Sequence, residues 1–172
     1  MLSNATEQEV LDNDVVFICL PTPMNKDGSC YIDIVEAAIK RVFEFGVAKT
    51  VVIKSTVPPG TTSKWNKQFP SLDVVFNPEF LTEANAVSDY ENQTRIILGG
   101  PRKSTTKLKP IFAKVFPKAS IIKTASTYAE MVKYVTNSFL ATKVSFANEM
   151  YQICEGLDVD YDKVIEYATY DE

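Results

Sequence analysis

Residues 14–20 read DVVFICL and are followed at residues 21–29 by a loop, PTPMNKDGS. The first run is β-branched and apolar without alternation, as in a strand that is buried on both faces of a parallel sheet. The prolines, asparagine and glycine of the loop end this strand. The next segment, YIDIVEAAIKRVFEF at residues 31–45, has apolar residues at helical spacing. This strand–loop–helix unit predicts an α/β fold.

The same pattern continues along the chain. TVVIK (50–54) predicts a second buried strand, which the paired prolines of STVPPGTT (55–62) end. Three more strands are predicted at LDVVF (72–76), TRIILGG (94–100) and SIIKT (120–124). Strands that alternate with helical segments favour a parallel sheet with right-handed crossovers.

Three further helical segments carry distinct signals. STTKLKPIFAKVF (104–116) predicts a helix that Pro110 should kink, or whose start it should move. From Ser126 to Gly156, apolar residues recur every three or four positions without a breaker, which predicts one long helix. The Asp-rich stretch after Gly156 predicts the start of another helix.

Composition excludes several classes of function. A net charge of -4 and a pI near 5.0 argue against a nucleic-acid binder, which needs a basic face. No apolar run approaches the roughly 18 residues of a membrane span, and the N-terminus lacks a signal-peptide pattern. The cysteines are odd in number and widely spaced, which argues against a disulfide framework. We expect a cytoplasmic protein without a nucleic-acid or membrane partner.

Two residue types are absent or scarce. The chain has no histidine, which removes any His-based triad, general base or metal site, and we expect no metal. The six glycines do not have the spacing of GxGxxG or of a Walker loop. A nucleotide would therefore bind without a glycine-rich phosphate loop from this chain.

Three loops follow successive predicted strands: residues 21–29, 55–62 and NPEFLTE at 77–83. In a parallel sheet, ligands bind beyond the carboxyl ends of the strands. The loops are either simple turns or parts of one site, and their common position favours a site. Glu79 and Glu83 have two interpretations as well. They mark a helix N-terminus, or they act as a general base and a ligand-binding acid.

Lys133 and Asn137 lie four residues apart on the predicted long helix. They belong to a solvated face, or they hold an anionic or carbonyl oxygen together. The cysteines are interpreted as structural. Cys19 is expected inside a buried strand, Cys154 on a helix, and Cys30 near a loop without a basic neighbour that would lower its pKa.

Four blocks, taken in order, resemble the UDP-glucose/GDP-mannose dehydrogenase family: DVVFICLPTPMNKDGS, VVIKSTVPPGTT, NPEFLTEANAVSDYENQTRIILGG and AEMVKYVTNSFLATKVSFANEM. Its members are NAD-dependent enzymes that oxidise the C6 alcohol of a nucleotide sugar to a carboxylate in two hydride transfers. The resemblance covers residues 7–172. It implies a partial Rossmann-like sheet, the C-terminal part of an NAD-binding domain, in residues 1–124. A central helical dimerisation domain would follow in residues 125–172.

The resemblance also implies roles for single residues on the cofactor side. Thr22 and Pro23 match positions that lie against the NAD, and Glu83 matches a glutamate near its nicotinamide end. Thr56 matches a threonine beside the reaction centre that helps to hold a catalytic water. Glu79 matches the general base, which acts mainly in thioester hydrolysis.

On the substrate side, Phe80 and Leu81 match residues whose backbone contacts the substrate. Lys133 and Asn137 match the lysine and asparagine that bind the substrate and stabilise the oxyanion of the thiohemiacetal. Arg95 matches a retained arginine, which we interpret as structural.

The family's GxGxxG turn and its catalytic cysteine are not in this chain. We therefore expect an NAD-dependent nucleotide-sugar dehydrogenase, with UDP-glucose as the first candidate substrate, that is inactive until another polypeptide completes it. That partner would be a second copy in a homodimer or a complementing chain. Two alternatives stay open. One is a non-catalytic fragment or assembly module that pairs through residues 126–156, and the other is a binding module for an unrelated nucleotide.

Overall fold

The computed structural model describes residues 6–46 and 49–170, apart from the side chains of Glu7, Leu11 and Glu83. Within these residues, five strands form one sheet in the order β1-β2-β3-β4-β5. They are β1 (Val15–Ile18), β2 (Thr50–Ile53), β3 (Asp73–Phe76), β4 (Arg95–Gly99) and β5 (Ser120–Thr124). The sequence predicted all five, and the predicted α/β fold is confirmed.

Strands β1, β2 and β3 are parallel, with Val16, Val51 and Val74 in register. Strands β4 and β5 are also parallel. Strands β3 and β4 are antiparallel and meet at a single pair, Phe76 and Gly99. The predicted parallel sheet is therefore confirmed except at this junction.

The physical reason lies in the connection between β3 and β4. It contains only the 3₁₀ helix η1 (Glu83–Asn85) and the short helix α4 (Ala86–Glu91). Phe76 and Gly99 are the last residues of their strands, so β4 approaches β3 from beyond its carboxyl end, and the chain does not return along the sheet between them. Instead, the segment after β3 runs beside β4, where the side-chain amide of Asn77 donates to the carbonyl oxygen of Ile97 at 2.9 Å.

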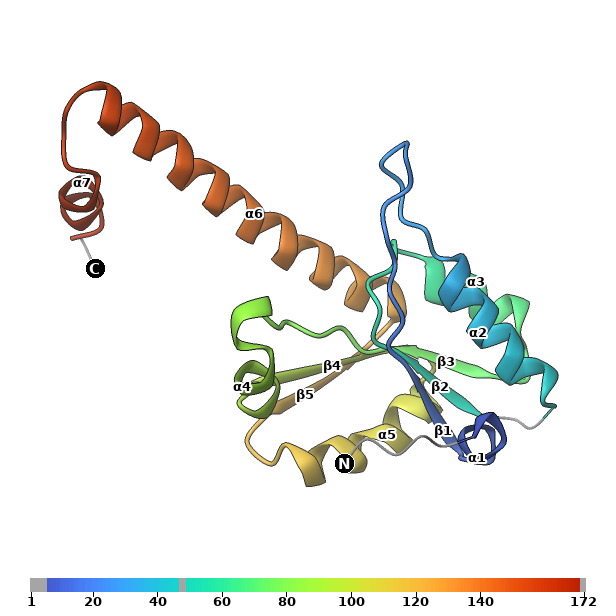
Figure 1. The fold of residues 1–172 in the computed structure, drawn as a ribbon. Coiled ribbons are helices and arrows are strands. Elements are labelled where there is room, and N and C mark those ends of the chain that lie inside the picture. The colour runs from blue at the N-terminus through green and yellow to red at the C-terminus, as the bar shows by residue number, and fades with distance from the viewer. Residues whose placement is uncertain (1–5, 47–48, 171–172) are drawn as a thin grey trace. The chain divides into compact units, whose positions relative to one another are not determined.

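Two apolar cores cover the two faces of this sheet. Helices α2 (Asp33–Glu44) and α3 (Thr61–Gln68) cover one face, and α5 (Arg102–Val115) covers the other (Figure 1). Neighbouring valines divide between them: Val51 belongs to the first core and Val52 to the second. Successive side chains of a strand point to opposite faces, so a strand buried on both faces shows the unbroken apolar run seen in the sequence.

Helix α5 differs from its prediction in one respect. It begins at Arg102 and continues through Pro110 to Val115, so the proline does not mark its start. At the N-terminus, a shorter helix, α1 (Glu7–Leu11), is capped by the hydroxyl of Thr6.

The predicted long helix is α6 (Ser126–Gly156), and its bounds agree with the sequence signals. The chain forms two compact units, Met1–Lys133 and Tyr134–Glu172, that divide within this helix. In the second unit, α7 (Tyr161–Ala168) starts at Asp160, whose carboxylate accepts from two backbone N–H groups. The domain boundary that we expect between residues 124 and 125 stays a prediction. Among the described residues, no helix, α6 included, is both long enough and apolar enough to cross a membrane.

Candidate functional site

The loops after β1 and β2 are joined at the carboxyl ends of their strands. The Thr22 hydroxyl donates to the carbonyl oxygen of Thr56 at 2.9 Å, and the Ser55 hydroxyl donates to that of Leu20 at 2.5 Å. The Cys30 thiol lies 3.8 Å from the same Thr56 oxygen. These contacts bring the two loops into one layer above the sheet edge.

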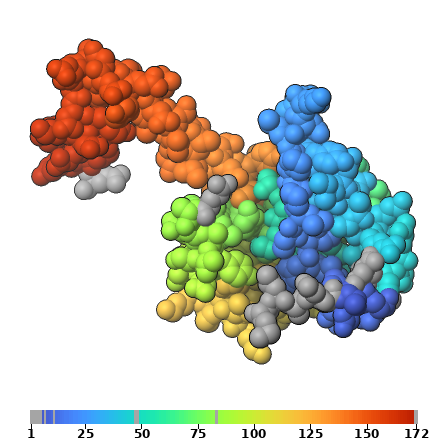
Figure 2. Space-filling model, viewed as in Figure 1, coloured from blue at the N-terminus to red at the C-terminus, as the bar shows by residue number. Residues whose placement is uncertain are grey.

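The loop after β1 is a small hairpin that stands out from the first unit (Figures 1 and 2). The N–H of Tyr31 donates to the carbonyl oxygen of Pro23 at 2.8 Å, and Met24 forms a bridge with Cys30. Gly28 makes the turn with a φ of 86°, in the left-handed region that glycine adopts without strain. Pro23 itself is exposed and Thr22 is half-buried.

Thr56 is half-buried, and its hydroxyl makes no hydrogen bond to any residue that the structure describes. Its carbonyl oxygen, by contrast, is used by Thr22. A threonine whose backbone is held and whose hydroxyl is free can accept or donate to a bound molecule.

The NPEF segment after β3 is held by a buried amide. Asn77 is 2% exposed, and its amide donates to Ile97 while its Oδ1 accepts from Lys54 Nζ at 3.0 Å. The backbone N–H of Asn77 extends the β2–β3 ladder to Ile53. Glu79 therefore lies in a non-helical segment, and the alternative that it begins a helix is wrong. Helix η1 begins at Glu83, whose side chain lies outside the described part of the chain.

Lys133 reaches this segment from α6. Its Nζ donates to the carbonyl oxygen of Glu79 at 2.6 Å and to Glu79 Oε1 at 3.1 Å. The Lys133 side chain is only 5% exposed, so the alternative of a solvated lysine is wrong. Asn137 is exposed and belongs to the second unit, and its role stays a prediction.

Four ionisable groups influence one another at this edge of the sheet. Burial lowers the pKa of Lys54, and this shift is opposed by Glu79 and Cys19 and increased by Lys133. Partial desolvation by the surrounding protein raises the pKa of the Cys19 thiol, although the residue is exposed, with Lys54 opposing the shift and Glu79 adding to it. The prediction that Cys19 is inside a buried strand is wrong, because β1 ends at Ile18 and Cys19 is exposed just beyond it.

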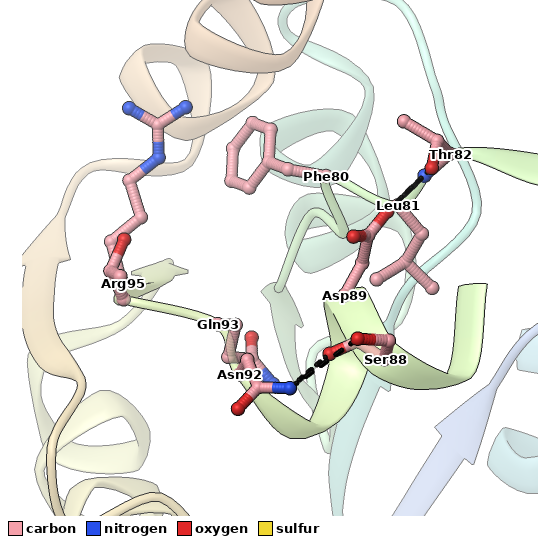
Figure 3. A pocket seen from close by; sticks show the side chains of 9 residues that line it. Phe80, Leu81, Thr82, Ser88, Asp89, Asn92, Gln93 and Arg95 are labelled. Atoms are coloured by element: carbon pink, nitrogen blue, oxygen red, sulfur yellow. Dashed lines mark hydrogen bonds between the residues drawn. The ribbon is translucent and has the colours of Figure 1, made fainter. Parts of the chain in front are cut away.

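A cleft of about 430 Å³ opens beside the NPEF segment (Figure 3). Its wall is formed by Phe80, Leu81, Thr82, Ser88, Asp89, Asn92, Gln93, Thr94 and Arg95. The guanidinium of Arg95 lies 4.4 Å from the centre of the Phe80 ring, and Lys133 Nζ lies 5.7 Å from the same centre. Phe80 thus connects this cleft with the Lys133–Glu79 pair.

The sequence did not predict a role in the site for three residues: Lys54, Asn77 and Glu130. Lys54 had a readable signal, since a charged residue ends an otherwise apolar buried strand. Asn77 and Glu130 had none, because their partners are far away in the sequence. Glu130 is fully buried on α6 and accepts from the N–H groups of Gly60 and Thr62.

Comparison with known proteins identifies similar sequences. Residues 1–117 match the model of the UDP-glucose/GDP-mannose dehydrogenase family, NAD binding domain, and residues 127–172 match that family's central domain. The chain is similar to the UDP-glucose 6-dehydrogenase TuaD of Bacillus subtilis, with 38% identity over 94% of this chain and 37% of that protein. It is also similar to the UDP-glucose 6-dehydrogenase AglM of Haloferax volcanii, with 36% identity over 92% of this chain and 41% of that protein.

Solved structures show the same arrangement of strands and helices. A UDP-glucose dehydrogenase from Pyrobaculum islandicum matches with a TM-score of 0.82 and 34% identity, over 98% of this chain and 41% of that chain. A GDP-mannose dehydrogenase from Pseudomonas aeruginosa matches with a TM-score of 0.82 and 31% identity, over 95% of this chain and 41% of that chain. This chain therefore spans 37–41% of the length of these relatives.

Proposed function

Since this chain belongs to the UDP-glucose/GDP-mannose dehydrogenase family, we propose that it supplies the central part of the active site of an NAD-dependent nucleotide-sugar 6-dehydrogenase. The proposed substrate is UDP-glucose, which is oxidised at C6 from alcohol to carboxylate. The relatives named UDP-glucose 6-dehydrogenase support this choice of sugar nucleotide.

The observation that carries the proposal is the contact between Lys133 and Glu79. An ammonium has three donors, and two of those of Lys133 are directed at the Glu79 carbonyl and Oε1. The third has no partner among the described residues and would bind a substrate oxygen on which negative charge develops. Because Lys133 is almost fully buried, such a contact is stronger than it would be in water.

Glu79 would act as the general base. Its Oε1 is held by Lys133, whereas Oε2 has no partner among the described residues and its side chain is 30% exposed. A carboxylate with one fixed and one accessible oxygen is suited to accept a proton from an alcohol or a water. Asn137 would be a second donor to the substrate oxygen.

Thr22, Pro23 and Thr56 fit the cofactor side of this site. The bond from Thr22 to Thr56 holds both loops, and the Thr56 hydroxyl is left without a protein partner among the described residues. When bound, NAD accepts the hydride from the sugar. The chain's residues would hold the nicotinamide end, with Glu83 nearby and Thr56 also placing a water. Phe80 and Leu81 would contact the sugar nucleotide beside the 430 Å³ cleft.

A second proposal concerns assembly. Beyond Lys133, α6 exposes large apolar side chains: Val135, Phe139, Leu140, Val144, Phe146, Tyr151 and Ile153. Apolar surface of this extent on one helix is typical of a protein–protein contact. We propose that α6 pairs with α6 of a second copy in a homodimer, which would also apply if the chain were an assembly module without catalysis.

Calorimetry with NAD, UDP-glucose and GDP-mannose tests the function. Heat of binding with NAD and UDP-glucose is expected, with the NAD signal weakened in Thr56→Val and the UDP-glucose signal weakened in Lys133→Met. Lys40→Met is the matched control, because Lys40 is an exposed lysine of α2. This variant should bind both NAD and UDP-glucose. Absence of heat with all three ligands would leave only the assembly proposal.

Catalysis is tested by NADH formation from UDP-glucose. We expect turnover when the chain is mixed with complementary segments of a relative such as TuaD, and none from the chain alone. Fast turnover by the chain alone would contradict the proposal that other segments complete the site.

A further inference from the structure

The first turns of α6 contain a buried carboxylate that the proposed reaction does not use. Glu130 is 0% exposed, and its two oxygens accept from Gly60 N at 2.6 Å and from Thr62 N at 2.8 Å. Within the described residues, no lysine or arginine forms an ion pair with it. Backbone N–H groups alone therefore hold this charge.

The two N–H groups are available because they lie at the start of a helix. Gly60 precedes α3 with a φ of 94°, and the first N–H groups of a helix have no partner within it. The same end of a helix carries partial positive charge and attracts anions. In this protein a side chain from another helix, rather than a bound anion, occupies that position.

Other contacts of α6 act in the same region. The hydroxyls of Ser126 and Ser63 lie 2.9 Å apart. Ala129 packs so closely on Gly99 that a Cβ at Gly99 would lie 2.4 Å from the Ala129 Cβ. Ser126, Ala129 and Glu130 lie on one side of α6, so these contacts together fix the rotation of the helix, and Glu130 adds two bonds to the start of α3.

Lys133 follows Glu130 by three residues, so the two side chains lie on neighbouring positions of one helix face. The carboxylate binds the loop that carries Thr56, and the ammonium binds the segment that carries Glu79. Rotation of α6 would move both groups together.

We propose that Glu130 is a positioning residue, which holds α6 at the rotation that places Lys133 Nζ against Glu79 and joins this helix to the STVPPG loop. The consequence for catalysis rests on the proposed dehydrogenase function. The geometric part does not, and it can be measured without any ligand.

The experiment measures how fast single lysines are methylated by formaldehyde and a borohydride, using mass spectrometry of the peptides. In the unaltered chain, Lys133 should react slowly. In Glu130→Gln, an amide would have to face two N–H donors, and Lys133 should react roughly tenfold faster as the first turn of α6 opens locally.

Lys49 and Glu36 supply the controls. Lys49 is 6% exposed and donates to the Asn13 carbonyl, so its continued protection reports that the fold is intact. Glu36 accepts from Trp65 and Gln68 of α3, but belongs to α2. Glu36→Gln makes the same chemical change on the other side of α3, and should leave the reaction rate of Lys133 unchanged.

Unchanged protection of Lys133 in Glu130→Gln would overturn the inference. If Glu130→Gln exposes Lys49 and Lys133 alike, Glu130→Asp decides, because it keeps the charge but is shorter by one methylene. The inference then requires faster reaction of Lys133 with Lys49 still protected. Equal exposure of both lysines in Glu130→Asp would show that Glu130 only supports the fold. Since no NAD or sugar is present, these outcomes are independent of the proposed activity.

Discussion

Lys133 Nζ lies 2.6 Å from the carbonyl oxygen of Glu79 and 3.1 Å from Glu79 Oε1, although 54 residues separate the two in the sequence. The bond joins the start of α6 to the segment that leaves the carboxyl end of β3. It thereby places a buried cation beside a carboxylate that is partly open to solvent.

Replacing Lys133 by methionine tests the strength of this bond. Lys133→Met keeps most of the side-chain volume but leaves Glu79 without its cation, and should lower the free energy of unfolding by about 1–3 kcal/mol. Urea unfolding measures the change. Lys40→Met removes a cation from an exposed pair with Glu44 and should change stability by less than about 0.5 kcal/mol. Equal effects of the two variants would contradict the buried bond.

Gly99 permits the close approach of α6 to β4. In Gly99→Ala, the new Cβ would lie 2.4 Å from the Ala129 Cβ and 3.0 Å from the Ser126 Cα, so the helix must shift. We expect a loss of about 1–3 kcal/mol of stability, measured by thermal unfolding. Gly156→Ala is the control, since nothing lies within 4 Å of its added methyl, and alanine favours a helix by up to about 1 kcal/mol. If Gly99→Ala leaves the thermal stability unchanged, Gly99 and Ala129 are not in tight contact.

Glu36 should make stability depend on pH in the acid range. The hydrogen bond from the Trp65 indole, and then that from Gln68, lower the pKa of Glu36 from its ordinary value of 4.5. The folded state therefore binds the charged form of Glu36 better than the unfolded state does. The resulting gain in folding stability is fully present at pH values above the ordinary pKa of 4.5. It is lost as pH falls through the lowered pKa. Unfolding between about pH 6 and about pH 3 should therefore be less pH-dependent in Glu36→Gln.

Trp65 is the single tryptophan of the chain, and its fluorescence can follow this unfolding. Glu44→Gln, which changes an exposed carboxylate at the end of the same helix, should keep the pH dependence of the unaltered chain. If the stability of Glu36→Gln and that of the unaltered chain fall equally as the pH is lowered, the hydrogen bond from the indole does not form in solution.

The Cys19 thiol reports on the charges around it. Partial desolvation raises the pKa of Cys19, the Lys54 ammonium opposes the shift, and the Glu79 carboxylate adds to it. Lys54→Met should therefore raise the pKa of Cys19 further, and Glu79→Gln should lower it. The pH dependence of alkylation by iodoacetamide, followed on the Cys19 peptide, measures both shifts. Lys26→Met, in the exposed loop after β1, should have no effect. Shifts of the same sign in the first two variants would contradict the grouping of these residues.

The apolar residues of α6 should mediate self-association. Phe139 is 62% exposed, and Phe139→Asp would place a charge in the proposed contact. We expect at least a roughly tenfold weaker association by sedimentation, because burying an unpaired charge is costly. Met150→Asp should act in the same direction. Val87→Asp, at a 74% exposed position of α4, should not change the association. An entirely monomeric unaltered chain would exclude the homodimer.

Much of the fold could be predicted from the sequence because the signals are local. An unbroken β-branched run such as that of β2 is favourable only where both faces are covered, as Val51 and Val52 are by the two cores. Helical spacing from Ser126 to Gly156 likewise predicted α6. The order of four sequence blocks indicated the family, which the family models confirm.

Only the tertiary structure decided what depends on distant partners. Four features each depend on a contact with a residue far along the chain. They are the antiparallel junction of β3 and β4, the burial of Lys133, the hydrogen bond from Asn77 to Ile97, and the bonds that the Glu130 carboxylate accepts. The exposure of Cys19 depends on where pairing with β2 ends. Periodicity in a sequence reports which side of an element is apolar, but it does not report which element covers that side. The sequence therefore determined the strands, the helices and the family, and long-range packing determined how Glu79, Lys133 and Glu130 meet.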